Sequence, residues 1–193
     1  MSKTVLITSF ATWKNNQHAN SSDELLAAVS QTYALPSSIY LLRQLPVNTP
    51  VAKEMAIAQV IRLQPQVMLC CGMAEPREKL SLELRAVVNN QVLQTSVHLT
   101  ELMKDLSHSE ISHDAGRFVC NSFYYSMMDY FRMNDSINHS SINHSSIQGS
   151  QGFDLQSVDL QCACLFIHVP ILTNLNRSQI LMDFCKILNK CVF

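Results

Sequence analysis

Short apolar runs alternate along this chain with longer stretches in which apolar residues recur every three or four positions. The runs have the length of β-strands, and the longer stretches have the spacing of amphipathic α-helices. The apolar runs predict strands over residues 4–8, 38–43, 67–71, 80–88 and 161–168. The periodic stretches predict helices over residues 22–33, 51–62, 97–106, 121–133 and 177–190.

The alternation of strands with helices indicates an α/β protein, because parallel strands need a helical crossover between them. We therefore expect a single-domain three-layer α/β/α sandwich with a mostly parallel central sheet, spanning residues 1–193. In such sheets the chemistry lies at the carboxyl ends of the strands. Gly72 and His168 both fall at the ends of predicted strands.

One segment does not fit this pattern. The sequence INHSS at residues 137–141 is repeated at residues 142–146. A five-residue period matches neither a helix nor a strand, and residues 134–152 are polar and low in complexity. His139 and His144 could bind a metal weakly, but a tandem insertion in a tolerant surface loop is the simpler interpretation.

The charge and the apolar runs exclude several classes of protein. The net charge is −1, which removes the electrostatic case for a nucleic-acid partner. No apolar run approaches the length of a membrane span, and the chain opens on a strand pattern rather than on a signal peptide. We therefore expect a cytoplasmic protein with no nucleic acid and no membrane among its partners.

The seven cysteines do not have the spacing of a disulfide scaffold. The pairs Cys70-Cys71 and Cys162-x-Cys164 could suggest a metal site. Zinc sites, however, use paired two-residue spacings or nearby histidines, which are absent here. Because these cysteines fall within predicted strands, we favour small buried hydrophobic residues and expect no metal.

Cys120 is the strongest candidate for chemistry. Residues 115–118 form a small turn that delivers it to the start of the helix predicted over residues 121–133. Unpaired N–H groups and the dipole at a helix N-terminus favour a thiolate, which is the nucleophilic form. A free cysteine is nevertheless more often a buried core residue, so a base and an orienting group are needed to support catalysis.

Two further residues could complete such a site. His168 closes the apolar run of residues 161–168, where it could point into a cleft or be a buried histidine bonded to the backbone. Glu83 lies in a stretch of alternating leucines and shares a face with Ser81 and Arg85. A face of this kind is usually exposed to water, so Glu83 carries little weight by itself.

Together these segments resemble one family closely, the pyroglutamyl peptidase I (pyrrolidone-carboxylate peptidase) family of cysteine peptidases. The segment AGRFVCN at residues 115–121 matches the block around the nucleophile of that family, and FIHVP at residues 166–170 matches its histidine strand. A loop of the form G-x-A-x-x-R, followed by a hydrophobic residue, Ser, one residue and Glu, matches at residues 72–83. The order Glu, Cys, His is also that of the family.

The resemblance implies a three-layer α/β/α fold and an enzyme that removes N-terminal pyroglutamate from peptides through a thioester. It implies the catalytic residues Cys120 as nucleophile, His168 as base and Glu83 as orienting group, with no cofactor. The lactam ring would lie in an apolar slot, and Gly72 and Arg77 would lie in the oxyanion region. The residues that match the substrate-binding positions of the family are Phe10, Trp13, Phe118 and Val119.

The chain also departs from the family. Residues 11–16 replace its glycine-rich loop, and Glu75 and Pro76 replace the two glycines before the arginine. The connection from Glu83 to Cys120 is much shorter than is usual, and in the family this region lies near the subunit contacts. We therefore expect a monomer or a weak homo-oligomer. The alternative function is that of a catalytically weak or inactive homologue that acts as a binding protein.

Overall fold

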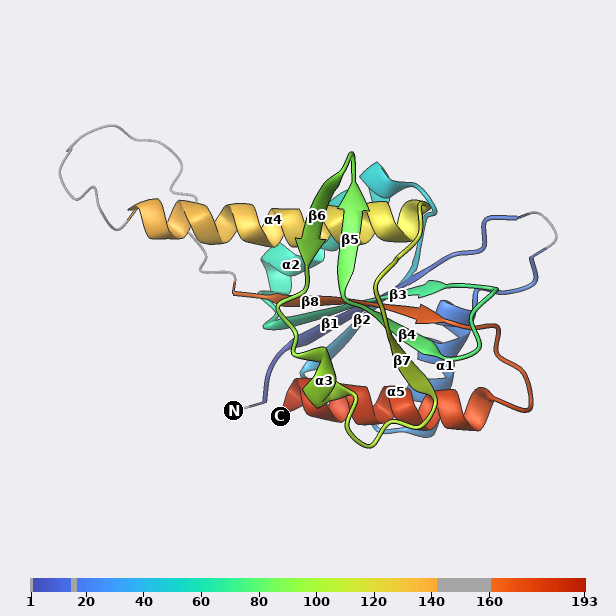
Figure 1. Ribbon diagram of the computed structural model, residues 1–193. Helices are drawn as coiled ribbons and strands as arrows, with labels where there is room; N and C mark the ends of the chain where they lie inside the picture. Colours follow the sequence, from blue (N-terminus) through green and yellow to red (C-terminus); the bar gives the residue numbers. More distant parts are fainter. Residues whose placement is uncertain (1, 15–16, 142–160) are drawn as a thin grey trace.

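A computed structural model describes residues 2–14, 17–141 and 161–193, and from residue 136 to residue 141 it describes the backbone alone. The described chain forms a six-stranded sheet between two layers of helices (Figure 1). The order of its strands is β2-β1-β3-β8-β4-β7. Their bounds are β1 (Val5–Phe10), β2 (Ile39–Leu45), β3 (Val67–Met73), β4 (Leu80–Glu83), β7 (Ser109–Ser112) and β8 (Ala163–Val169).

The first four strands of this order are parallel, whereas β4 pairs with β8 in the antiparallel sense and β7 follows β4. Helices α1 (Ser21–Thr32) and α5 (Arg177–Val192) pack on one face of the sheet. Helices α2 (Thr49–Leu63) and α4 (Val119–Ser141) pack on the other. The expected sandwich with a mostly parallel sheet is therefore confirmed. None of the helices in the described ranges has the length and apolar character needed to cross a bilayer.

The strand predicted over residues 80–88 is wrong as a single element. The chain leaves the main sheet at Leu84, and β5 (Arg85–Val88) then pairs with β6 (Gln91–Gln94) as a separate hairpin beside α4 (Figure 1). Asn89 and Asn90 join the two strands with φ angles of 50° and 63°, which is typical of a two-residue hairpin turn. Asn121 on α4 fixes the hairpin, since its side chain bonds both the N–H and the carbonyl of Val87.

Two helix predictions also need correction. The helix predicted over residues 97–106 is reduced to α3 (Leu99–Leu102), a single turn. The helix predicted to end at residue 133 continues to Ser141 and includes the first INHSS copy, which we had expected to lie in a loop. The initial turns of α4 pack on the sheet, and extending a formed helix is far easier than nucleating one. Residues 142–152 lie outside the described residues.

Alkaline pH is expected to destabilise this fold. Burial raises the pKa of Cys191 to about 11 and raises the pKa of Cys71, a thiol in β3. The thiols of the unfolded chain titrate near about 8.5. Above that pH the folded state holds more protons than the unfolded state, so the free energy of unfolding falls as the pH rises. We expect the urea midpoint to be steady from about pH 7 to 8 and to fall from about pH 9 to 11. A constant midpoint up to about pH 11 would contradict the burial of these thiols.

Candidate active site

His168 and Glu83 form a buried pair at the junction of the parallel and antiparallel parts of the sheet. His168 lies on β8, and Glu83 lies at the end of the neighbouring strand β4. Because β4 runs antiparallel, Ser81 is opposite His168 and Glu83 is opposite Phe166, all on one face of the sheet. The Nδ1 atom of His168 lies 2.7 Å from Oε1 of Glu83. This contact leaves Nε2 of the imidazole free to exchange a proton elsewhere.

Cys120 reaches the same face from the first turn of α4. The loop before the helix turns at Gly116, where φ is 78°, a conformation that glycine adopts without strain. The side chain of Asp114 supports the turn by accepting a hydrogen bond of 2.9 Å from the Gly116 N–H. Cys120 is then the second residue of α4, where the N–H groups of the first turn have no partner within the helix.

Gly72 brings the cysteine and the histidine together. On the paired strands β3 and β8, Gly72 and His168 are direct neighbours. A Cβ atom added to Gly72 would lie 2.7 Å from Sγ of Cys120, so the sulfur occupies the space that a side chain at position 72 would take. The sulfur therefore lies over the strand position next to His168. Burial raises the pKa of the Cys120 thiol to about 12, so the free protein holds a neutral thiol that needs a base.

Cys120 and His168 line one cleft of about 390 Å³. Its mouth carries two aromatic side chains, Trp13 and Phe118, whose ring centroids are 6.4 Å apart. They are 52% and 76% exposed, so an apolar surface is available to a ligand. An ion pair of 2.8 Å between Lys14 and Glu75 lies at the same cleft. The cleft thus combines a nucleophile, a base and an apolar wall.

Two residues predicted to contact substrate do not line this cleft. Phe10 is buried in the core, where its ring packs edge-on against Phe123 at 5.3 Å. Val119 is half-buried and also packs against the core. Both residues support the elements that form the cleft, because β1 ends at Phe10 and α4 begins at Val119. Matching a motif could not distinguish a wall residue from the residue packed behind it.

Arg77 lines the cleft, but its guanidinium group is turned toward carboxylates. Its NH2 atom lies 3.7 Å from Oε1 of Glu83, and its NH1 atom lies 3.5 Å from Oε1 of Glu110. NH2 also donates to the Ser112 hydroxyl at 3.1 Å and to the Asp114 carbonyl at 3.0 Å. The NH2 group is therefore engaged by acceptors of the protein, and the place of Arg77 in the oxyanion region stays a prediction.

Sequence reasoning missed Tyr124, which connects the helix of the cysteine to the strand of the glutamate. Its buried hydroxyl donates to the backbone carbonyl of Glu83 at 3.0 Å. The signal was present in the spacing, because Tyr124 follows Cys120 by four residues and so lies on the same face of α4. Its partner could not be predicted, since the antiparallel course of β4 was not visible in the sequence.

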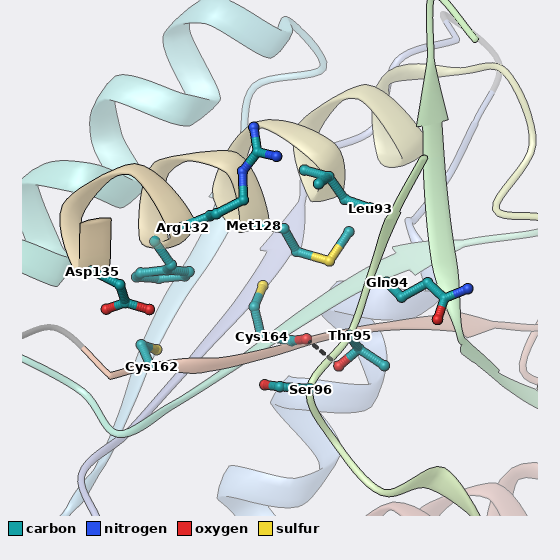
Figure 2. Close-up of a pocket in the computed structure, with 10 residues that line it drawn as sticks. Leu93, Gln94, Thr95, Ser96, Met128, Arg132, Asp135, Cys162 and Cys164 are labelled. Atoms are coloured by element: carbon teal, nitrogen blue, oxygen red, sulfur yellow. Dashed lines mark hydrogen bonds between the residues drawn. The ribbon is translucent and has the colours of Figure 1, made fainter. Parts of the chain in front are cut away.

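A second cavity, of about 320 Å³, lies between α4, β8 and the segment that follows β6 (Figure 2). Its walls include Cys162 and Cys164, and the Thr95 hydroxyl donates to the Cys164 carbonyl at 2.6 Å. It shares no lining residue with the first cleft. Within residues 2–14, 17–141 and 161–193, no group of three or more His, Cys, Asp or Glu side chains could hold a metal ion.

Comparison with known proteins defines the fold. No protein-family model matches the chain, and no curated protein matches it. Among solved structures, it is similar to pyroglutamyl peptidase I from Bacillus amyloliquefaciens, with a TM-score of 0.70 and 18% identity over 96% of this chain and 94% of that one. It is also similar to a variant of pyrrolidone carboxyl peptidase from Pyrococcus furiosus, with a TM-score of 0.66 and 18% identity over 96% of both chains. The chain therefore has the fold of the pyroglutamyl peptidases, as its motifs led us to expect.

Proposed function

We propose that this protein is a cysteine peptidase that removes an N-terminal pyroglutamate residue from peptides. One observation carries the proposal. The sulfur of Cys120 lies over Gly72, the strand neighbour of His168, whose Nδ1 atom is held by Glu83 at 2.7 Å. Nucleophile, base and orienting group thus follow one another on a single face of the sheet, which is the arrangement that nucleophilic catalysis requires.

The chemistry follows from these roles. Sγ of Cys120 attacks the pyroglutamyl carbonyl while Nε2 of His168 accepts the thiol proton. When the tetrahedral intermediate collapses, the C–N bond breaks and the imidazolium returns the proton to the leaving amine. Water then attacks the thioester with His168 again as base, which releases pyroglutamate and restores the thiol. Glu83 holds the tautomer of His168 and stabilises its charged form.

Backbone groups would stabilise the oxyanion of this intermediate. The unpaired N–H groups of the first turn of α4 surround Cys120, and the positive end of the helix dipole favours negative charge there. The loop of residues 72–77, most of which lines the same cleft, would contribute further donors.

The aromatic pair at the mouth of the cleft suits a lactam ring. Pyroglutamate is small, flat and uncharged, so it needs an apolar slot and few hydrogen bonds. Trp13 and Phe118 provide exposed ring faces in the cleft that holds Cys120. The peptides implied as substrates are therefore those whose first residue is cyclised and carries no charged amine.

The decisive experiment compares a pyroglutamyl amide with a prolyl amide that carries the same fluorescent leaving group. We expect hydrolysis of the first and a preference of about 100-fold or more in kcat/KM, because the charged amine of the second would lie unpaired in an apolar slot. Acid quenching during turnover should trap the pyroglutamyl thioester on Cys120, which intact-protein mass spectrometry detects. Binding of the pyroglutamyl amide without turnover or a trapped adduct would show a binding protein instead.

A further inference from the structure

The carboxylate of Glu83 is buried with few hydrogen bonds. The residue is 0% exposed, and Oε1 contacts Nδ1 of His168. Oε2 has no hydrogen-bond partner among the residues that the structure describes. A buried carboxylate held by a single hydrogen bond is unstable as an ion unless a positive charge lies nearby.

Arg77 supplies that charge. In the described part of the chain it is the one arginine or lysine whose side-chain nitrogen lies within 4.0 Å of the Glu83 carboxylate, at 3.7 Å. Its position is fixed by hydrogen bonds to the hydroxyl of Ser112 and to the carbonyl of Asp114. Asp114 also supports the turn into α4, so the same guanidinium contacts both the glutamate and the loop that delivers Cys120.

We propose that Arg77 is a positioning residue that compensates the charge of the Glu83 carboxylate and thereby sets the lower pH limit at which His168 can act as a base. The inference rests on the proposed function for its kinetic consequence, but the charge arrangement stands apart from any reaction. Among the described residues, the titratable groups around Glu83 are His168 from β8, Arg77 from the β3–β4 connection, and Cys120 and Tyr124 from α4. Glu110 of β7 faces Arg77 from the other side, at 3.5 Å.

The sign of the effect follows from Coulomb's law. Without the positive charge of Arg77, the negative charge of the Glu83 carboxylate is no longer compensated, so the neighbouring imidazole of His168 holds a proton more readily and is lost as a base. In Arg77→Gln, the acidic limb of the kcat/KM profile should therefore move to higher pH, by about one pH unit. Below neutral pH the kcat of Arg77→Gln should fall. At a pH above the acidic limbs of both the variant and the unaltered protein, KM should change little. Arg77→Lys retains the charge and should show a smaller shift.

Two other variants separate the charge effect from the anchoring of the loop. Arg85 donates from Nε to the carbonyl of His113 at 2.8 Å, so it holds the same loop without an ion pair to Glu83. Arg85→Gln should leave the pH profile unchanged. Glu110→Gln keeps the oxygen that accepts from the Ser81 hydroxyl but removes a negative charge beside Arg77. Its acidic limb should move slightly in the opposite direction, to lower pH.

A readout without turnover distinguishes failure of this inference from failure of the proposed function. The ring-nitrogen NMR signal of His168, assigned by its loss in His168→Gln, should titrate at higher pH in Arg77→Gln than in the unaltered protein. An unaltered titration in Arg77→Gln overturns the inference even if pyroglutamyl amides are hydrolysed. A shifted titration supports it even if no substrate is turned over. If Arg77→Gln does not fold, the pH profile of Glu110→Gln decides. A shift of its acidic limb to lower pH supports the inference, and an unchanged acidic limb counts against it.

Discussion

Cys120→Ala is expected to lower kcat/KM for a pyroglutamyl amide by about 10⁴-fold or more, because no other group can form the thioester. His168→Ala should cause a loss of similar size, and the double variant should lose little more, since nucleophile and base act as a unit. The loss of kcat/KM in Glu83→Gln should be smaller, by about one to two orders of magnitude, than the loss when Cys120 or His168 is replaced. The rate of fluorophore release gives kcat of each variant at saturating substrate and kcat/KM at substrate concentrations far below KM.

A matched cysteine variant controls for general effects of removing a thiol. Cys162 is half-buried and lines the second cavity rather than the cleft. Cys162→Ala should therefore keep the activity of the unaltered protein and its sensitivity to iodoacetamide. If Cys120→Ala retained activity near that of Cys162→Ala, the cysteine-peptidase proposal would be wrong. If Glu83→Gln matched the unaltered protein, its contact with His168 would be structural only.

The hydrophobic pattern predicted the layers of the fold because the central strands β1, β3 and β8 are buried along nearly their whole length, as their continuous apolar runs indicate, and a helix such as α5 buries one face. It failed where the chain changes sheets. Leucines alternate with polar residues from residue 80 to residue 85, and the apolar residues 86–88 follow without a break. Nothing in this pattern shows that the strand divides between two sheets. The chain nevertheless leaves the main sheet at Leu84, whose N–H bonds the carbonyl of Ser112 and whose carbonyl accepts from Thr95.

Strands β6 and β7 were missed for a related reason. Both are four residues long, and β7 forms the edge of the main sheet. The sequences of the two, QVLQ and SEIS, contain too few apolar residues to give a periodic signal. Edge and hairpin strands of this kind are held by pairing with their neighbours rather than by burial of their own side chains.

The candidate site was predictable in its parts but not in its connections. Cys120 and His168 follow from the placement of one at a helix start and of the other at a strand end, together with the family motifs. The environment of Glu83 does not, because it depends on β4 running antiparallel beside β8. The same reversal places Arg77 beside Glu83 and Glu110. Long-range strand order therefore decides which charges meet, and local sequence patterns do not carry it.

Gly72→Ala is expected to lower kcat/KM by about 100-fold or more and to lower the free energy of unfolding by about 1–3 kcal/mol. The added methyl group would lie 2.7 Å from both Sγ of Cys120 and Cζ of Phe166. Strand β3 cannot move aside easily, because it pairs with β1 on one edge and β8 on the other. The ring of Phe166 is fully buried between Tyr124 and His168, so the movable atom is the sulfur.

Rotation of Sγ away from β3 would separate the nucleophile from His168, and the activity should therefore fall more than the stability. Alkylation of Cys120 by iodoacetamide should remain possible in Gly72→Ala, which distinguishes a displaced sulfur from an unfolded protein. A double-variant cycle isolates the contact. In a Cys120→Ala background one of the two clashing atoms is gone, so Gly72→Ala should destabilise less than in the unaltered protein. Equal destabilisation in both backgrounds, with normal turnover in Gly72→Ala, would place the sulfur elsewhere and remove the geometric basis for pairing Cys120 with His168.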